Sequence, residues 1–447
     1  MSKPGLATRI AATLLLTRII DDGRNLDGLL DTRHGPRQFA ELSQTDKALA
    51  RAIVTVALRR RGEIDFALGR LLDRKLPAKA RQLHHTLHVA AAQILFLDIP
   101  DSAAVDLAVT ALRNDKRSTR FSGLANAVLR RLSREKEELF ANKSNQDLAV
   151  MNMAPWFAKS VKKDYGRERM MAIAEQHMLE PLIDITVKTQ PEEWAKRLGG
   201  QQVFGNSIRV TREGGVETWP GFEQGEWWVQ DAAASLPAHL FGDVAGKSAL
   251  DLCAAPGGKT AQLAAGGADV SALEASEPRL MRLKGNLDRL GLSANCHHAD
   301  MMEWQSDLQF DFVLLDAPCS STGTVRRHPD VQWSKSPQVV AELADLQFNM
   351  IARARDFLKP GGTLIFSNCS LNRVEGEDVF ARVSQAGLGL QPDPISASEC
   401  FGLTELVNKQ GAIRTLPSHL QGLDTETANP RLGGLDGFYC ARFIRET

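Results

Sequence analysis

Long apolar runs and closely spaced cysteines are both absent from this sequence. No stretch of ~18 consecutive apolar residues occurs, which excludes a membrane-spanning helix. The apolar run AATLLL (11–16) is too short for the core of a signal peptide, and no small-residue cleavage pattern follows it. The six cysteines lie 23 to 50 positions apart without a CxxC pair, which argues against a disulfide framework. These absences predict a cytoplasmic protein with reduced thiols and no membrane partner.

Net charge is lacking as well, because 54 Lys and Arg balance 54 Asp and Glu. The balance hides an asymmetry: residues 1–140 carry 24 Lys and Arg against 16 Asp and Glu, and the remainder carries the opposite excess. A basic front indicates a polyanionic partner such as nucleic acid, although solvated helix faces give the same count. At 447 residues, the chain is expected to form two or three domains.

Residues 1–140 are predicted to form an all-helical bundle. In LHHTLHVAAAQILFL (83–97) the apolar residues recur at the spacing of one helix face. Similar segments at 9–22, 47–72, 102–112 and 121–135 bring the expected number of helices to five. Two basic clusters, Arg59 to Arg61 and the loop 114–120, either face phosphates or are simply solvated.

The pattern becomes mixed between residues 141 and 228. LIDITVK (182–188) and VFGNSIRV (203–210) have the composition of short strands, and PEEWAKRLGG (191–200) between them reads as a helix that ends on glycines. This region is predicted to be a small α+β connector.

From residue 229 onwards strands alternate with helices, which favours a parallel sheet with helices on both faces. The first strand, SALDLC (248–253), leads into AAPGGKT (254–260), where a glycine turn and a helix N-terminus suit a polar or anionic ligand. A phosphate-binding P-loop is excluded because Cys253 stands where that motif needs glycine, and the dinucleotide fingerprint GxGxxG is absent.

Acidic residues follow the next three predicted strands. Glu274 comes 17 residues after Gly257, close to the ~20 expected for an acid that binds a ribose diol, although a solvated carboxylate fits equally. Asp300 and Asp316 end the third and fourth strands. Because open α/β sheets bind ligands at the carboxyl edge, the pattern predicts a site for an adenosine compound there.

Two cysteines are expected to meet at the same edge. Cys319 follows the fourth strand in DAPCS (316–320), and Cys369 ends the fifth in GGTLIFSNCS (361–370). An isolated cysteine is usually inert filling, but two thiols beside Asp316 indicate reagents.

Metal binding is not predicted. A zinc site needs at least three well-placed ligands, and His328 is the one further candidate near the two cysteines. His84 and His88 lie four positions apart on one helix, but no third ligand accompanies them, so a structural role is favoured.

Four motifs of the second half resemble those of the RNA (cytosine-5)-methyltransferases of the Sun/Fmu family. They are LDLCAAPGGKT (250–260), DAPCS (316–320), TGTVRRHPD (322–330) and NCS (368–370), and VQDAAAS (229–235) and LDGFYCARF (435–443) extend the likeness. The resemblance implies a class I methyltransferase-type α/β fold with a doubly wound, Rossmann-like sheet over residues 229–447.

The front helices resemble the RNA-binding domain of the antitermination factor NusB, chiefly in SAAVDLAVTAL (102–112) and GLANAVLRRL (123–132). The combination points to the small-subunit ribosomal RNA members of the Sun/Fmu family. It implies a NusB-like domain (1–140), the connector (141–228) and the methyltransferase domain (229–447). A monomer that acts on 16S ribosomal RNA is the implied form.

The resemblance also implies a methyl donor, S-adenosylmethionine, and the residues that bind it. These are Cys253, Ala254, Ala255, Pro256, Gly257, Gly258 and Lys259, with Glu274 on the ribose, Asp300 near the adenine and Asp316 beside the reacting end. The implied reaction methylates carbon 5 of a cytosine through a covalent cysteine adduct. In this family Cys369 is the nucleophile, Cys319 assists its release and Asp316 hydrogen-bonds the ring.

The base must leave any helical stack to react, so loop or single-stranded RNA is the expected substrate. Arg326, Arg327 and His328 are then candidates to hold its phosphates, and a solvated loop is the alternative. Trp333 either stacks on a base or is buried.

Three alternatives stay open on the sequence alone. Cys319 is the nucleophile if the chain follows the Pro-Cys motif of DNA cytosine methyltransferases. The protein is an RNA-binding assembly or antitermination factor if its catalytic half is vestigial, and a small-molecule methyltransferase is the third possibility. The family usually has Thr where Asn368 stands and Asp where Glu274 stands, which puts efficiency in doubt.

Overall fold

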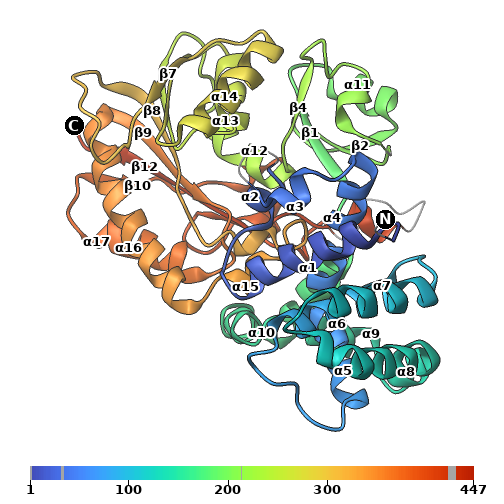
Figure 1. The fold of residues 1–447 in the computed structure, drawn as a ribbon. Coiled ribbons are helices and arrows are strands. Elements are labelled where there is room, and N and C mark those ends of the chain that lie inside the picture. The colour runs from blue at the N-terminus through green and yellow to red at the C-terminus, as the bar shows by residue number, and fades with distance from the viewer. Residues whose placement is uncertain (1–2, 32–34, 213, 421–428) are drawn as a thin grey trace. The chain divides into compact units, whose positions relative to one another are not determined.

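The chain folds into two units, one helical and one built on sheets (Figure 1). The computed structural model describes residues 3–31, 35–212, 214–420 and 429–447. The helical unit comprises Met1–Met178 and Arg327–Ser336, and the sheet unit comprises Leu179–Arg326 and Pro337–Thr447. The predicted connector is divided between them, because α9 (Asn145–Met151) and α10 (Pro155–Met178) lie in the first unit, whereas α11 (Pro191–Leu198) and the short strands lie in the second.

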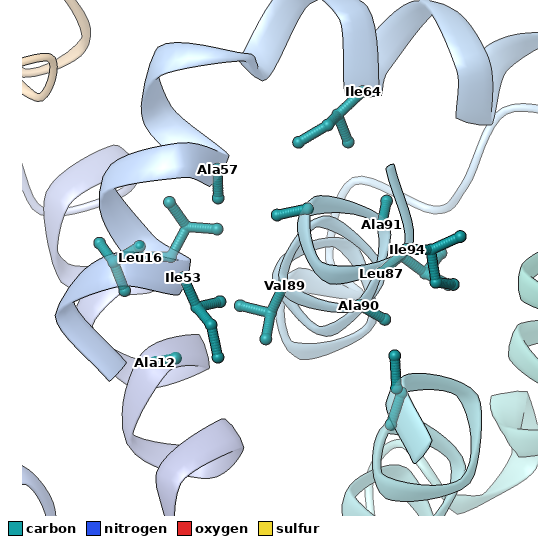
Figure 2. Close-up of a cluster of buried hydrophobic side chains, with 14 of the residues drawn as sticks. Ala12, Leu16, Ile53, Ala57, Ile64, Leu87, Val89, Ala90, Ala91 and Ile94 are labelled. Atoms are coloured by element: carbon teal, nitrogen blue, oxygen red, sulfur yellow. The ribbon is translucent and has the colours of Figure 1, made fainter. Parts of the chain in front are cut away.

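The helical unit has its core around one central helix. Its helices are α1 (Leu6–Ile20), α2 (Leu26–Leu30), α3 (Arg37–Ala40), α4 (Gln44–Arg59), α5 (Arg61–Leu71), α6 (Arg81–Phe96), α7 (Asp101–Asn114), α8 (Ser122–Phe140), α9 (Asn145–Met151), α10 (Pro155–Met178) and α15 (Val331–Ser334). Leu87, Val89 and Ala91 of α6 are all buried, and side chains of α1, α4 and α5 gather around them (Figure 2). Residues on nearly every face of α6 are buried, as expected of a helix at the centre of a bundle.

The single helix predicted over 47–72 is wrong, because the structure has α4 and α5 there. The backbone leaves the helical region at Arg60, where φ is −105° and ψ is 20°. Beyond this break, a Cβ at Gly62 would overlap the carbonyl of Met151 in α9. The break and the glycine together let α5 lie directly against α9.

Residues 327–336 pack into the helical unit although they follow the DAPCS motif in sequence. The indole nitrogen of Trp333 donates to the carbonyl of Leu58 at 3.0 Å. The amide of Ala154 donates to the Gln332 side chain at 2.9 Å, and the Asp330 carboxylate accepts from the amide of Leu26 at 2.9 Å. Trp333 is partly buried and packs against the core of the bundle, which agrees with the second of its two predicted roles only in part.

The sheet unit begins with a small antiparallel sheet in the order β2-β3-β1-β4. Its elements are β1 (Ile183–Val187), α11 (Pro191–Leu198), β2 (Gly200–Phe204), β3 (Ser207–Val210) and β4 (Trp227–Val229). Arg209 and Asp184 form a buried ion pair across β3 and β1, with Nε and Oδ1 2.7 Å apart. The strand predicted at 182–188 and the helix predicted at 191–200 are confirmed. The segment 203–210 is not one strand: it contains the end of β2, a turn at Gly205 and Asn206, and β3.

The main sheet runs in the order β10-β12-β9-β8-β5-β6-β7, with β11 paired to β12. Its strands are β5 (Ser248–Leu252), β6 (Asp269–Glu274), β7 (Asn295–His298), β8 (Phe310–Asp316), β9 (Leu358–Asn368), β10 (Leu390–Pro392), β11 (Ile413–Thr415) and β12 (Phe438–Arg445). Strands β5 to β9 are mutually parallel, as predicted, and β12 pairs antiparallel with β9. The chain reverses its direction of strand addition between β5 and β8, so the loops after these two strands diverge at the usual ligand position of such sheets.

Helices cover both faces of the main sheet. They are α12 (Ala232–His239), α13 (Gly258–Ala265), α14 (Glu277–Leu290), α16 (Pro337–Ala354) and α17 (Glu377–Gln385). In β8, Val313 and Leu315 join a buried cluster that contains residues of α16 and α17, whereas Leu314 joins one that contains residues of α12. This alternation is what a strand buried on both faces requires.

Candidate active site

The loop after β5 is held in a fixed conformation by its neighbours. Cys253 and Gly257 have left-handed backbones, with φ of 63° and 106°. The amide of Ala254 donates to Leu273 at 2.9 Å, and the carbonyls of Ala255 and Pro256 accept from Arg279 and Asn286 at 2.6 and 2.8 Å. The chain then enters α13 at Gly258. The predicted arrangement of strand, glycine turn and helix N-terminus is confirmed.

Glu274 is the last residue of β6, and Asp300 lies two residues beyond the carboxyl end of β7. The Glu274 side chain is 4% exposed and accepts backbone hydrogen bonds from Ser276 at 2.9 Å and Ala255 at 3.3 Å. It is therefore not the solvated carboxylate of the alternative reading. Asp300 is exposed, and its Oδ1 accepts from the amide of Met302 at 2.9 Å.

Asp316 and Lys259 form an ion pair that joins the β8 end to the β5 loop. Lys259 Nζ donates to Asp316 Oδ2 at 2.6 Å, and the Ser367 hydroxyl donates to Asp316 Oδ1 at 3.0 Å. Burial alone would lower the pKa of Lys259, but the neighbouring Asp316 carboxylate outweighs burial and raises it. Lys259 therefore stays a cation beside the thiols.

Asp251 lies in β5 beneath this ion pair and is almost fully buried. Its Oδ2 accepts from the Thr260 hydroxyl at 2.6 Å, whereas Oδ1 is buried and has no hydrogen-bond partner among the described residues. Burial raises the pKa of Asp251 to about 7. A donor supplied by a ligand would satisfy this oxygen.

The sulfur atoms of Cys319 and Cys369 lie 3.4 Å apart. They meet because β8 and β9 are adjacent and parallel, with Asp316 level with Ser367, so both loops leave the sheet side by side. The hydrogen bond with Cys369, together with burial, raises the pKa of Cys319 well above its ordinary value. Burial raises the pKa of Cys253, in the β5 loop, to about 12. Cys319 and Cys253 therefore keep their protons at neutral pH.

Arg326 does not have the exposed position that was predicted for it. Its side chain is 3% exposed and donates to Asp231 and Asp436, each at 2.8 Å. Because both of these contacts are buried ion pairs, they conflict with a role in holding RNA phosphates. His328 is partly exposed, and its Nδ1 lies 3.5 Å from an Asp27 carboxylate oxygen. Arg327 is half-buried, and the roles proposed for these last two residues stay predictions.

The histidine pair of the helical unit has partners within the protein. His88 Nε2 lies 2.7 Å from Asp65 Oδ1, and its Nδ1 lies 2.8 Å from the carbonyl of His84. In the described ranges, no three His, Cys, Asp or Glu side chains are arranged as a metal site. Within the same ranges, no helix is both long and apolar enough to cross a membrane.

Comparisons with known proteins match both halves of the chain. A family profile for "16S rRNA methyltransferase RsmB/F" matches residues 240–444, and one for the NusB family matches residues 6–134. The ribosomal RNA small subunit methyltransferase B of Enterobacter sp. (strain 638) is 32% identical over 465 residues, which cover both chains completely. The chain belongs to the 16S rRNA methyltransferase RsmB/F family. The corresponding protein of Cronobacter sakazakii is 31% identical and covers 99% of this chain and 100% of its own length.

Solved structures support the fold of this RsmB/F family member. A methyltransferase homologue from Pyrococcus horikoshii matches with a TM-score of 0.53 at 24% identity, covering 67% of this chain and 98% of its own. The crystal structure of PH0851 matches over 100% of both chains with a TM-score of 0.71 at 20% identity. The predicted order along the chain, a NusB-like helical region followed by a methyltransferase sheet, is confirmed.

One functional candidate of this family member was missed by the sequence reasoning. Glu375, six positions after Cys369, is completely buried and lies beneath both thiol-bearing loops. Its Oε2 accepts from the hydroxyls of Ser320 and Ser370 at 2.5 and 2.6 Å. Its backbone carbonyl accepts from the Asn368 side chain at 2.7 Å. A single acidic residue in a loop forms no sequence motif, so the contacts of Glu375 become visible only in the folded structure.

Proposed function

We propose that the protein methylates carbon 5 of a cytosine in small-subunit ribosomal RNA through a covalent adduct with Cys369. Membership of the 16S rRNA methyltransferase RsmB/F family supports the substrate class. The observation that carries the proposal is the 3.4 Å distance between the sulfur atoms of Cys319 and Cys369, next to Asp316. Two thiols at one point suit a reaction in which one sulfur adds to the ring and a second group helps it to leave.

The chemistry explains why a thiol is needed. Carbon 5 of cytosine is a poor nucleophile, so the Cys369 thiolate first forms a bond to carbon 6 and moves electron density to carbon 5. Carbon 5 takes the methyl group, a base removes its proton, and the bond between sulfur and carbon 6 breaks. We assign assistance in this last step to Cys319. Asp316 hydrogen-bonds the ring edge and favours its electron-poor form.

S-adenosylmethionine is the methyl donor, and when bound it supplies an electrophilic methyl group on a sulfonium. The residues present fit this group. The buried Oδ1 of Asp251 has no hydrogen-bond donor in the part of the chain that the structure describes, and the left-handed backbone at Gly257 turns the chain into α13. Residues 253–259 would hold the donor, with Glu274 towards its ribose and Asp300 towards its adenine.

The helical unit supplies a surface that suits RNA. Arg113, Lys116, Arg117 and Arg120 are exposed around the loop between α7 and α8. Exposed cations that are close in sequence neutralise phosphates and account for much of the affinity of nucleic-acid-binding proteins. The match of this region to the NusB family agrees with such a role.

Transfer of a labelled methyl group to unmodified ribosomal RNA, followed by mapping of the product, tests the proposal. Label in 5-methylcytosine is expected. The Cys369→Ala variant is expected to lose both methylation and the covalent RNA adduct on denaturing gels, whereas Cys319→Ala is expected to retain an adduct. An adduct in Cys369→Ala would reverse the two roles. No incorporation by the wild type would favour an RNA-binding factor.

A further inference from the structure

Glu375 makes direct contacts with both loops that carry the thiols. We propose that Glu375 is a positioning residue: its buried carboxylate holds the Cys319 loop so that Cys319 Sγ stays beside Cys369 Sγ. This inference rests on the proposed function, because the step that it serves is the release of the RNA adduct.

The residues on each side of Cys319 are both anchored through this carboxylate. The backbone amide and the hydroxyl of Ser320 donate to Oε1 and Oε2 of Glu375 at 2.8 and 2.5 Å. On the other side, Gln347 Nε2 donates to the carbonyl of Pro318 at 2.9 Å and to Glu375 Oε1 at 3.2 Å. The Cys319 loop therefore depends on Glu375 at two points.

The Cys369 loop depends on the carboxylate less. The Ser370 hydroxyl donates to Oε2 at 2.6 Å, but the backbone amide of Ser370 is held separately by Asn368 at 3.0 Å. Cys369 also follows the last residue of β9, and its carbonyl accepts from the amide of Gly323 at 2.9 Å. Loss of the carboxylate should therefore displace Cys319 more than Cys369.

The negative charge of Glu375 matters as well as its shape. Four donors converge on the two oxygens, which a carboxylate accepts and an amide cannot, because an amide has one acceptor oxygen. Its charge adds to the effects of Cys369 and of burial on Cys319, which is thereby kept protonated. A protonated Cys319 thiol can donate its proton to the Cys369 sulfur as the bond between that sulfur and carbon 6 breaks.

Glu375→Gln is the test, and Asp378→Asn is the matched control, because Asp378 is exposed and the charge change is the same. We expect Glu375→Gln to bind S-adenosylmethionine like the wild type and to keep a similar KM for RNA. Its kcat should fall by about 100-fold, the lower range for loss of a proton-transfer group. A covalent RNA adduct should accumulate on denaturing gels, as is also expected for Cys319→Ala. The control should show none of these changes.

A double variant separates positioning from a general effect on folding. If Glu375 acts through Cys319, then Cys319→Ala with Glu375→Gln should turn over no more slowly than Cys319→Ala alone. If the reductions in turnover rate of the two single variants multiply in the double variant, the inference is overturned. A wild-type rate in Glu375→Gln would overturn it as well. If Glu375→Gln fails to bind S-adenosylmethionine, Ser320→Ala removes one of the same hydrogen bonds and should also accumulate adduct. Its failure to do so would then overturn the inference.

The two proposals fail in different ways. Absence of adduct and of methylation in both the wild type and Cys319→Ala would refute the proposed function. Normal behaviour of those two proteins, with no adduct in Glu375→Gln, would refute only the role of Glu375.

Discussion

The buried ion pair between Arg209 and Asp184 makes a prediction about stability whose size follows from its contacts. Arg209 Nε and Nη2 donate to the two Asp184 oxygens at 2.7 and 2.8 Å, and both side chains are at most 1% exposed. Arg209→Met leaves the Asp184 charge buried without its partner. Removal of one partner from a buried pair typically costs about 3–5 kcal/mol, and we expect that loss here.

The double variant Arg209→Met with Asp184→Leu should be more stable than Arg209→Met alone, because no unpaired charge remains. It still leaves the carbonyls of Leu432 and Gly433 without the guanidinium donor and the amide of Ala232 without its acceptor. At about 1–3 kcal/mol for each buried group left without its partner, the three losses should cost the double variant about 3 kcal/mol or more.

Urea unfolding followed by tryptophan fluorescence measures these differences, because five of the seven tryptophans lie in the sheet unit. The exposed Arg212 provides the control, and Arg212→Met should change the free energy of unfolding by less than about 0.5 kcal/mol. The reasoning is refuted if Arg209→Met costs less than about 1 kcal/mol, or if the two single losses simply add in the double variant.

Three further predictions follow from single side chains. Gly62→Ala should destabilise the helical unit by about 1–3 kcal/mol, because the added Cβ would overlap the carbonyl of Met151. Gly69→Ala in the same helix has open space around it and should stabilise the unit by about 0.5 kcal/mol. Equal effects of the two variants on thermal unfolding would contradict the overlap. Leu87→Ala should cost about 3–5 kcal/mol in urea unfolding because the side chain is fully buried, and a cost below about 1 kcal/mol would argue against this core. The pKa of Asp251 is raised from 3.8 to about 7 by burial, so its contribution to stability is greatest below pH 3.8 and is lost as the pH rises through 7. The free energy of unfolding of Asp251→Asn, relative to that of the wild type, should therefore rise by about 3 kcal/mol between pH 5 and pH 8. A difference that does not change with pH would show that the pKa of this carboxyl is not raised.

The parallel sheet and its edge could be predicted because four of its five parallel strands are largely apolar, and each of the five is followed by or ends in a chemically distinct residue. The order of strands and loops alone placed Cys319 and Cys369 at adjacent ends of β8 and β9, and their sulfur atoms do meet there. Local pattern was sufficient because parallel strands have their carboxyl ends at one edge.

Long-range packing accounts for what the sequence did not reveal. The break between α4 and α5 depends on the approach of α9 at Gly62, about ninety positions from Met151 in sequence. Arg326 was predicted to hold RNA phosphates, yet Asp231 and Asp436, both distant in sequence, form buried ion pairs with it. Strands β10 and β11 were not predicted because each is only three residues long. The role of Glu375 was not predicted for the same reason, because the groups that donate hydrogen bonds to it come from three separate segments of the chain.

The path of the chain through residues 327–336 has a practical consequence for anyone who wishes to isolate either half. The polypeptide passes from one unit to the other three times, after residues 178, 326 and 336. A truncated protein that starts at residue 179 would still carry Val331 and Trp333, now stripped of the bundle against which they pack, and the bundle expressed alone would lack them. Neither half is a contiguous module, so a faithful dissection requires a redesigned bridge across positions 326 and 337 as well as a new terminus.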